Sequence, residues 1–420
     1  MKRDSLKPML VLAAAGGLLL TAVAVAVVAG PLDPPAGPVT STHKTLSEVE
    51  PRIAINAANT PGDADSLFKI TQPGSYYLTG NVTGVVGKHG IEIAVPPNGP
   101  GVTIDLSGFE MAGVAGMGAF DGVNTAAAVI NVTVRNGTIR NWGDEGVELG
   151  NSSTAVDLGV SGCAGFGIVL GQNSSAVRCR VTSNVAGGIA TGMECNIQSC
   201  SAQGNGGIGG IGAFNGCTVL DCTAYFNTGN GISTGHTSTI SRCSSVDNTL
   251  AGFSFGSSCN VSNCAASFND SYGFTGLDGA TVSNSTSASN FSLGFFLRDN
   301  AQMTACTARL NSGDGIAVSS GGTVSGCSAV ENGFRGITTV AAVVVVECVS
   351  YGNGGDGISV FTGCTVSACS VRNNAGNGIH TSGSSIIVGK ICVQNGTNGD
   401  GAGIHASLGD SRIEGNSCIE

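Results

Sequence analysis

Charged residues are scarce in this 420-residue chain: Asp, Glu, Lys and Arg make up 11% of it, and aromatic residues only 5%. An ordinary globular domain carries about a quarter charged residues. Low charge together with 41% hydrophobic content excludes a disordered, self-repelling polymer. The net charge is −10, and no cluster of Lys and Arg lies beyond the first few residues. Nucleic-acid binding is therefore disfavoured, because it needs a basic surface.

Long helices are disfavoured by the residues that are abundant. Glycine accounts for 67 residues, and Gly and Asn recur everywhere after residue 80. Both are poor helix formers. The composition therefore favours short strands joined by tight turns, repeated many times.

The N-terminus has the pattern of an export segment. Lys2, Arg3 and Lys7 precede an apolar run from Met9 to Ala29, and small residues follow it. We predict that residues 1–29 are a signal peptide, or a membrane anchor if they are not cleaved. Residues 30–50, with four prolines between Pro31 and Pro38, are predicted to be a spacer. Either way the protein is expected to be exported, to the periplasm, the cell surface or the medium.

An internal repeat dominates the rest of the chain. Its anchor is the second residue of a Gly-Ile, Gly-Val or Gly-Phe dipeptide, which recurs about every 21 residues, with one step a single residue longer. The anchors are Val147, Ile168, Ile189, Ile211, Ile232, Phe253, Phe274, Phe295, Ile316, Ile337, Ile358, Ile379 and, after a longer step, Ile404.

Two further columns keep the same register. Asn lies five residues before the anchor at Asn184, Asn227, Asn248, Asn269, Asn290, Asn311, Asn332, Asn353 and Asn374. Cys lies ten before it at Cys179, Cys222, Cys243, Cys264, Cys306, Cys327, Cys348 and Cys369, with Cys200 beside the single longer step. The Cys column and the stacked Phe253, Phe274 and Phe295 are predicted to face the core. Asn tolerates a left-handed conformation better than most residues, and stacked Asn amides can hydrogen-bond from coil to coil.

The repeat predicts the fold. Small or β-branched residues alternate within each short run, so they share one face of a strand, and only stacked coils can bury that face. A period of about 21 residues is the size of a three-stranded coil, and no shorter period is visible. We predict an all-β, single-stranded, right-handed parallel β-helix. The Gly before each anchor is expected to allow a bend or a positive φ.

The domain organisation follows from where the repeat is regular. Residues 51–71 are predicted to cap the N-terminal end of the core, because an uncapped sheet edge promotes aggregation. Residues 72–146 are predicted to form the first, irregular coils, and residues 147–420 the regular ones. The last coil is expected to be incomplete, because the chain stops before the next Asn and anchor.

The segment PGDADSLFKITQPGSYYLTGN at 61–81, with GVTIDLSGF at 101–109, resembles the opening of exported bacterial right-handed β-helix repeat proteins of the pectin-lyase-like superfamily. The resemblance covers residue 51 onward and implies the β-helix fold. Members include polysaccharide lyases, polygalacturonases and epimerases, and also surface-attachment proteins and periplasmic proteins that mature copper sites. The Asn-Thr-Asp, Asp-Asp and Gly-His-Gly motifs of the polygalacturonases are absent from this chain, as is an obvious acidic calcium cluster.

Few residues break the repeat, and they are the candidates for chemistry. Glu148, with Asp144 nearby, is the one carboxylate in the column just after the anchors, and that column should face outward. Glycosidases need two carboxylates flanking the bond. Asp314, Arg335 and Asp356 lie two before the anchors on three successive coils, with the Asp pair about 9–10 Å apart. That separation is near the range of inverting glycosidases, but an inter-coil salt-bridge ladder at a turn is the interpretation we favour for these three residues.

His380 and His405 occupy equivalent positions on consecutive coils and are the candidate metal ligands, about 5 Å apart. No third ligand is evident. The 16 Cys are read as buried thiol ladders, with disulfides or metal as alternatives. No cofactor is expected.

The first functional hypothesis is a non-catalytic exported scaffold that binds or displays, with a polysaccharide or the cell-envelope glycan as partner. The alternative is a polysaccharide lyase, glycoside hydrolase or epimerase. A weaker alternative is a metal-handling periplasmic protein. Contact with a membrane is expected only through an uncleaved N-terminal segment.

Overall fold

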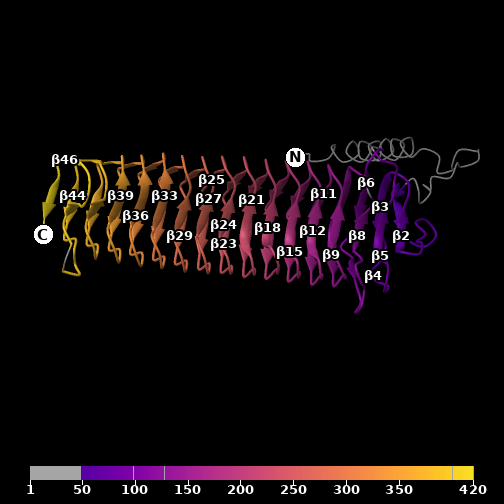
Figure 1. Ribbon diagram of the computed structural model, residues 1–420. Helices are drawn as coiled ribbons and strands as arrows, with labels where there is room; N and C mark the ends of the chain where they lie inside the picture. Colours follow the sequence, from indigo (N-terminus) through magenta and orange to yellow (C-terminus); the bar gives the residue numbers. More distant parts are fainter. Residues whose placement is uncertain (1–48, 98, 127, 400, 420) are drawn as a thin grey trace, which may run out of the picture. The chain divides into compact units, whose positions relative to one another are not determined.

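The computed structural model describes residues 49–97, 99–126, 128–399 and 401–419. The chain divides into two units, Met1–Pro51 and Arg52–Glu420. The second unit contains the 47 strands found among the described residues, stacked coil after coil along one axis from β2 to β46 (Figure 1). The predicted signal segment, 1–29, lies outside the described residues, as does nearly all of the spacer. No helix long and apolar enough to cross a membrane occurs among the residues that are described.

One strand of each coil belongs to a 16-stranded parallel sheet, called sheet B below. Its members pair with the equivalent strand of the next coil, so that the anchors are direct partners: Ile168 faces Ile189, and Ile316 faces Ile337. The strands are β2 (Ser66–Ile70), β5 (His89–Ile93), β8 (Val123–Thr125), β10 (Val147–Leu149), β12 (Phe166–Leu170), β15 (Gly187–Thr191), β18 (Gly209–Ala213), β21 (Asn230–Thr234), β24 (Phe253–Phe255), β27 (Phe274–Gly276), β30 (Phe295–Leu297), β33 (Ile316–Ser320), β36 (Ile337–Ala341), β39 (Ile358–Thr362), β42 (Ile379–Thr381) and β45 (Ile404–Ala406).

The other two strands of each coil form sheet A, with 31 strands. The first column is β1 (Ile53–Ile55), β3 (Gly74–Leu78), β6 (Val102–Asp105), β9 (Val132–Arg140), β11 (Thr154–Ser161), β13 (Ser175–Val177), β16 (Asn196–Gln198), β19 (Thr218–Leu220), β22 (Thr239–Ser241), β25 (Asn260–Ser262), β28 (Thr281–Ser283), β31 (Gln302–Thr304), β34 (Thr323–Ser325), β37 (Val344–Val346), β40 (Thr365–Ser367), β43 (Ile386–Val388) and β46 (Arg412–Glu414).

The second column of sheet A is β4 (Val82–Thr83), β7 (Glu110–Ala112), β14 (Arg180–Thr182), β17 (Ser201–Gln203), β20 (Thr223–Tyr225), β23 (Ser244–Val246), β26 (Ala265–Ser267), β29 (Thr286–Ala288), β32 (Thr307–Arg309), β35 (Ser328–Val330), β38 (Val349–Tyr351), β41 (Ser370–Arg372), β44 (Ile391–Val393) and β47 (Ser417–Ile419). Strands β9 and β11 run through both columns and join them. The predicted all-β parallel solenoid is confirmed.

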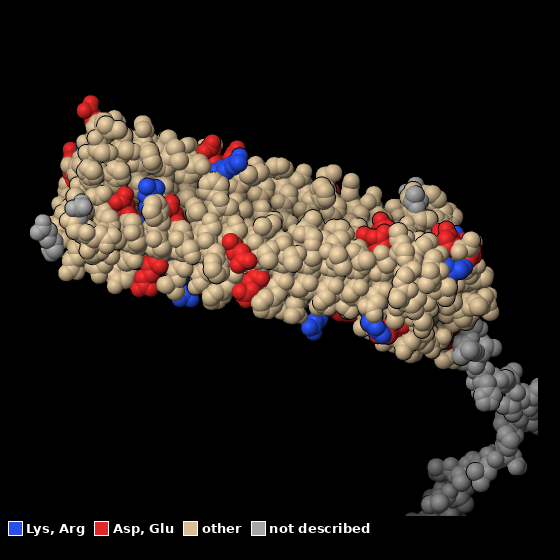
Figure 2. Space-filling view, turned by 60° about the horizontal axis from the view of Figure 1, so that its bottom comes forward, with Lys and Arg blue, Asp and Glu red and all other residues tan. Residues whose placement is uncertain are grey.

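The core is an apolar column between the sheets. Within a three-residue strand the central residue or the two outer ones are buried, as in β34, where Val324 is buried between Thr323 and Ser325. The rings of Phe253, Phe274 and Phe295 stack with centroids 4.7 and 4.6 Å apart, as predicted. Charged side chains are few on the face seen in Figure 2 and lie in small groups.

A buried ladder of asparagines runs along the core, and it includes Asn205 and Asn395 in addition to the predicted members. In each step the Nδ2 of one Asn donates to the Oδ1 of the Asn on the next coil, for example Asn290 to Asn311 at 2.9 Å. The backbone N–H of Asn290 donates to the same oxygen at 3.1 Å. Both side-chain atoms are thus satisfied inside the core, which a buried amide requires.

Cysteines form a second ladder of the same kind. The backbone N–H of Cys179 donates to the Sγ of Cys200, and that of Cys306 to Cys327, each at 3.4 Å. All 16 cysteines are free, and all but Cys418 are buried, as the thiol-ladder interpretation predicts. Lys390 takes the place of Cys in this column near the C-terminal end. Its side chain is buried, and burial lowers the pKa of its amine.

The reason for the Gly before each anchor differs from the prediction. These glycines do not have positive φ. A Cβ on Gly315 would instead lie 2.6 Å from the Nδ2 of Asn332 and 2.8 Å from the carbonyl oxygen of Gly336. The Asn ladder and the next coil leave no room for a side chain, so close approach is what requires glycine there.

Left-handed residues lie at the coil corners instead. A regular coil has three of them, five residues apart, for example Ser258 (φ 57°), Asn263 (φ 54°) and Phe268 (φ 57°). The ladder asparagines themselves are not left-handed. The corner positions are usually filled by Gly, Asn, Asp or Ser, which tolerate this conformation better than other residues.

The segment 51–71, predicted to be a cap, is part of the solenoid. Strands β1 and β2 lie within it and pair in parallel with β3 and β5 of the next coil. The segment therefore covers the N-terminal end of the core as its first coil. In residues 72–146 the coils differ in length, and Trp142 is buried in their core.

We predict that Asn290→Ala lowers the free energy of unfolding by about 2–4 kcal/mol, because it leaves the buried N–H groups of Asn269 and the carbonyl of Ala266 without their partner. Urea unfolding followed by circular dichroism measures this. The exposed Asn260 provides the matched control, since Asn260→Ala should change stability by less than about 0.5 kcal/mol. Equal losses in the two variants would contradict a structural role for the ladder.

Candidate functional site

A cluster of carboxylates lies at the N-terminal end of sheet B. Ligand oxygens of Asp121, Asp144 and Glu145 all lie within 4.8 Å of one another. Asp121 precedes β8, and Asp144 and Glu145 precede β10, which is the neighbouring strand. The irregular coils thus bring two acidic turns side by side.

Asp121 is the buried centre of the cluster. Its side chain accepts hydrogen bonds from the Nδ2 of Asn124 at 2.7 Å and from the backbone N–H of Glu145 at 2.9 Å. The residue is 3% exposed. These two donors give the buried carboxyl group hydrogen-bond partners within the protein, which a buried polar group requires.

His89, at the start of β5, lies against the same aspartate. Its Nδ1 accepts the backbone N–H of Asp121 at 3.0 Å and lies 3.4 Å from the Oδ2 of that residue. The ring packs edge-on against Phe120, with centroids 5.0 Å apart. Burial opposes protonation of His89, but the hydrogen bond and charge of Asp121 outweigh burial and raise its pKa.

Glu145 is the most perturbed acid of the cluster. Burial, the hydrogen bond to Asp144 and the charges of Asp144 and Asp121 raise the pKa of Glu145 to about 8. Glu148, predicted as a candidate, lies near it on β10, and partial burial and the same two charges raise its pKa as well. A pKa of about 8 means that Glu145 keeps its proton at neutral pH.

A polar track crosses this end of sheet B. The residue after the anchor is Lys69 on β2, Glu92 on β5, Asn124 on β8 and Glu148 on β10, and these four are register partners in sequence. The Nζ of Lys69 lies 2.8 Å from the Oε2 of Glu92. From Val169 to Phe296 the same column carries no charged residue, and its polar members there are Ser233, Ser254 and Thr275, so the run of charged and amide side chains ends with the fourth strand of the sheet.

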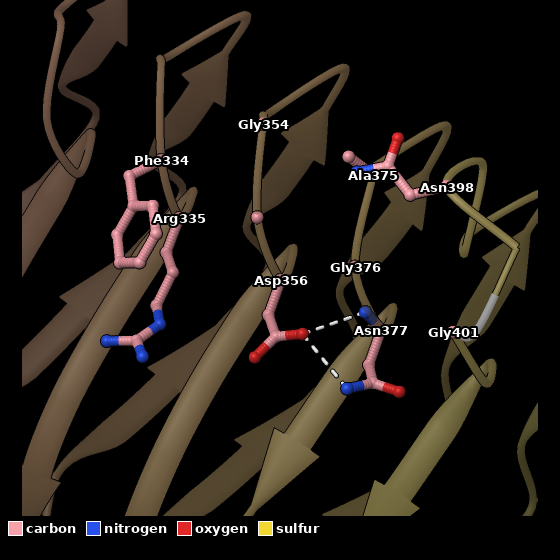
Figure 3. Close-up of a pocket in the computed structure, with 10 residues that line it drawn as sticks. Phe334, Arg335, Gly354, Asp356, Ala375, Gly376, Asn377, Asn398 and Gly401 are labelled. Carbon is pink, nitrogen blue, oxygen red and sulfur yellow. Dashed lines mark hydrogen bonds between the residues drawn. The ribbon is translucent and has the colours of Figure 1, made fainter.

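The second predicted set lies near the other end. The Oδ1 of Asp314 accepts the backbone N–H of Arg335 at 2.9 Å, and its Oδ2 accepts the hydroxyl of Thr338 at 3.0 Å. Asp356 accepts the backbone N–H of Asn377 at 2.7 Å and its side-chain amide at 3.0 Å (Figure 3). Each aspartate therefore holds the turn of the next coil in place by hydrogen bonds to its backbone.

The expected salt-bridge ladder is not formed. The guanidinium of Arg335 stacks on the ring of its neighbour Phe334, 4.9 Å from the centroid, and no ion pair joins it to Asp314 or Asp356 among the described residues. Arg335, Asp356 and Asn377 line a shallow pocket of about 320 Å³ (Figure 3). A catalytic role for this set stays a prediction.

His380 and His405 stack as predicted from the repeat. Their ring centroids are 5.2 Å apart and their planes 14° from parallel. The Nε2 of His380 lies 3.2 Å from the Oγ of Ser407, and its Nδ1 lies 3.4 Å from the Oδ2 of Asp356. Both ring nitrogens thus have neighbours already. Within the part of the chain that is described, neither histidine belongs to a group of three side chains close enough to hold a metal, and metal binding stays a prediction.

Sequence reasoning missed His89, Asp121 and Glu145. They occupy the column two before the anchor, the same column that holds Asp314, Arg335 and Asp356. The anchors of these early coils are Ile91, Val123 and Val147, which are unevenly spaced and farther apart than the later anchors. Because of this irregular spacing, the repeat alone could not show that these residues belong to the column two before the anchor.

Comparison with known proteins supports the fold. Residues 207–343 and 256–397 match the family model described as "Right handed beta helix region". This match and the stacked parallel coils show that the chain is a right-handed parallel β-helix. That is the fold of the pectin-lyase-like superfamily, whose members residues 61–81 and 101–109 resemble. No curated protein matches the chain significantly.

Several solved structures are similar. The A-module of the mannuronan C-5 epimerase AlgE4 of Azotobacter vinelandii is 16% identical, with 81% of this chain and 91% of that one covered, at a TM-score of 0.37. A mutant of the periplasmic alginate epimerase AlgG is 10% identical over 75% and 77% of the two chains, at 0.39. The catalytic unit of an α-1,3-glucanase of Streptomyces thermodiastaticus is 12% identical over 88% and 69%, at 0.34. At these identities the similarity concerns the fold alone.

The raised pKa of Glu145 gives a pH prediction. Between about pH 4.5 and pH 8 the folded chain keeps a proton on Glu145 that the unfolded chain has released, so stability falls as the pH rises through this window. The raised pKa values of His89 and Glu148 act in the same direction. Thermal unfolding should show the midpoint falling with pH, and falling less in Glu145→Gln.

The control is Asp278→Asn, at an exposed aspartate on a distant coil, which should keep the slope of the unchanged protein. A Glu145→Gln variant with the same pH slope as Asp278→Asn would mean that Glu145 titrates normally.

Proposed function

We propose that the protein is an exported glycan-binding β-helix whose binding site is the polar track and carboxylate cluster at the N-terminal end of sheet B. The observation that carries the proposal is the register of Lys69, Glu92, Asn124 and Glu148 on four adjacent strands. A polysaccharide running along the solenoid axis would meet a polar side chain at every coil, about 4.8 Å apart.

Charge favours a glycan without carboxylates of its own. The site holds Asp121, Asp144, Glu145 and Glu148, and the chain as a whole has a net charge of −10. Carboxylates accept hydrogen bonds from sugar hydroxyls and repel uronate groups. We therefore infer a neutral polysaccharide, or one with amino groups, rather than a uronate polymer.

Binding without turnover is the first form of the proposal, and catalysis is the second. The raised pKa of Glu145, in a cluster with Asp121 and Asp144, favours catalysis, because a carboxyl group that keeps its proton at neutral pH can act as a proton donor. In a hydrolase, lyase or epimerase, Glu145 would donate or accept the proton and Glu148 would contact the sugar.

Location outside the cytoplasm is part of the proposal and is supported by residues 1–29, which have the charge and hydrophobicity of an export segment. Composition supports the neutral glycan. Charged residues make up 11% of the chain, so the surface has little charge to attract other ligands.

Affinity electrophoresis of the full chain against neutral glucans, mannans and xylans, amino-sugar polymers and uronate polymers tests the binding. Retention is expected by a neutral or amino-bearing polymer and not by uronate polymers. The double variant Glu145→Gln, Glu148→Gln should bind at least about tenfold more weakly, since two carboxyl groups that would hydrogen-bond to the sugar are replaced by amides. Asp278→Asn is the control and should bind as the unchanged protein does.

Equal retention of the double variant and the control would place the binding elsewhere, and retention by no polymer would contradict the proposal. Incubation of each retained polymer, followed by assays for reducing ends, unsaturated products and epimerised sugars, separates the two forms. Product that appears with the unchanged protein and disappears in Glu145→Gln would establish catalysis.

A further inference from the structure

One corner of the solenoid carries an exposed row of large apolar side chains. The corner is the turn between the second sheet A strand and the sheet B strand of each coil. Eight successive coils place one such residue in it, each between 49% and 66% exposed. The row, called the apolar ridge, consists of Val185, Ile208, Phe226, Leu250, Phe268, Phe291, Leu310 and Phe334.

The ridge is not required by the turn. Three members, Phe226, Phe268 and Leu310, occupy the left-handed corner with φ of 56–57°. The equivalent residues of other coils are Asp247 and Ser289, which suit this conformation better. Apolar side chains that are both strained and exposed indicate a use other than stability.

The ridge also has definite ends. The turns of the next two coils hold Gly354 and Ala375, beside Phe334 (Figure 3). At the strand spacing of about 4.8 Å, the eight coils span about 34 Å parallel to the solenoid axis. A side chain at half exposure offers about 100 Å², so the ridge offers about 800 Å², the area that each partner contributes to a standard protein interface.

From these features we propose that two copies of the chain pair side by side through the apolar ridge. The ridge residues stand three, four or six residues before their anchors, and a second copy presents the same eight apolar side chains over the same length of solenoid, which a folded protein of another architecture does not. Closed two-fold pairs are also the most common symmetric assembly.

Charge decides the orientation. The ridge turns of the first three coils carry no charged residue, whereas the later turns hold Asp247, Asp270, Asp314 and Glu331, with Arg335 as the one base. A parallel pair would set each of the four acids against its own copy. An antiparallel pair sets Asp314 and Glu331 against the uncharged end and leaves only Asp247 and Asp270 facing each other. We therefore infer the antiparallel arrangement.

Sedimentation equilibrium of the full chain tests the pairing, in buffer with neutral detergent so that residues 9–29 do not drive association. The repeat supplies the substitutions. Phe268→Ser and Phe291→Ser introduce the residues found at the same positions of neighbouring coils, Ser289 and Ser312. The double variant should fold, and its dimer should dissociate at least tenfold more readily.

The control is Phe214→Ser with Phe361→Ser. Both phenylalanines are exposed and lie three residues after the anchor, Phe214 directly after β18 and Phe361 within β39, away from the ridge turns; Ser319 is the equivalent residue of another coil. It should dimerise as the unchanged chain does. A monomeric unchanged chain, or a ridge variant that dimerises like the control, would overturn the proposal.

The orientation has its own test. Benzoylphenylalanine placed at position 334 should cross-link on irradiation to residues 183–208 of the second copy. Cross-links to residues 331–336 of the second copy would overturn the antiparallel arrangement. A lipid surface is the other outcome. If the unchanged chain is monomeric and floats with lipid vesicles while the ridge variant does not float, the ridge binds lipid and the pairing proposal is wrong.

Discussion

The hydrogen bond between stacked asparagine side chains is the interaction on which the rest of this solenoid depends. From Asn184 to Asn374, each amide is bonded to the Asn of the next coil and to backbone groups of the neighbouring coils, and Asn395 ends the ladder. An amide buried in a core is costly unless every polar atom is paired, and a one-residue slip of any coil would leave two coils unpaired. The ladder thus fixes the register of the coils, and with it the period of the sequence. It also accounts for the glycine before each anchor, since a Cβ on Gly315 or Gly294 would meet the ladder and the adjoining coil.

Because the coils are equivalent, residues at the same position of successive coils lie side by side in a column. Polar groups can therefore replace the residues of one outward-facing column without disturbing the core. The carboxylate cluster uses the column two before the anchor and the column one after it, in the coils before the Asn ladder begins. The apolar ridge uses the corner that precedes the same sheet, over the coils where those columns carry almost no charge. The proposed glycan site and the proposed pairing surface thus occupy different lengths of the solenoid.

The fold was predictable because the repeat is long and regular. The register of His380 with His405, the stacked phenylalanines and the inward-facing cysteines all followed from counting along the repeat. Two local predictions were wrong for physical reasons. Arg335 does not bridge the aspartates, because the backbone N–H groups of the next coil already occupy one oxygen of each. Glycine is required before each anchor because there is no room for a side chain, and not because the backbone has a positive φ there. The cluster around Asp121 was not predictable from the repeat, because the anchors from Phe68 to Val147 do not keep the period of the later coils. The extra residues between these anchors shift the period, so the early coils can be aligned with the later ones only when the strand pairing is known.

The most direct test of the central claim is hydrogen exchange of asparagine side-chain amides, followed by NMR on the full chain. The ladder predicts that the Nδ2 protons from Asn184 to Asn374 exchange more than about a thousandfold more slowly than those of the exposed Asn260 and Asn398, because they open only when coils separate. Exchange of the ladder amides at the rate of the exposed ones would contradict it, and would show that the coils are held in register by something other than this ladder.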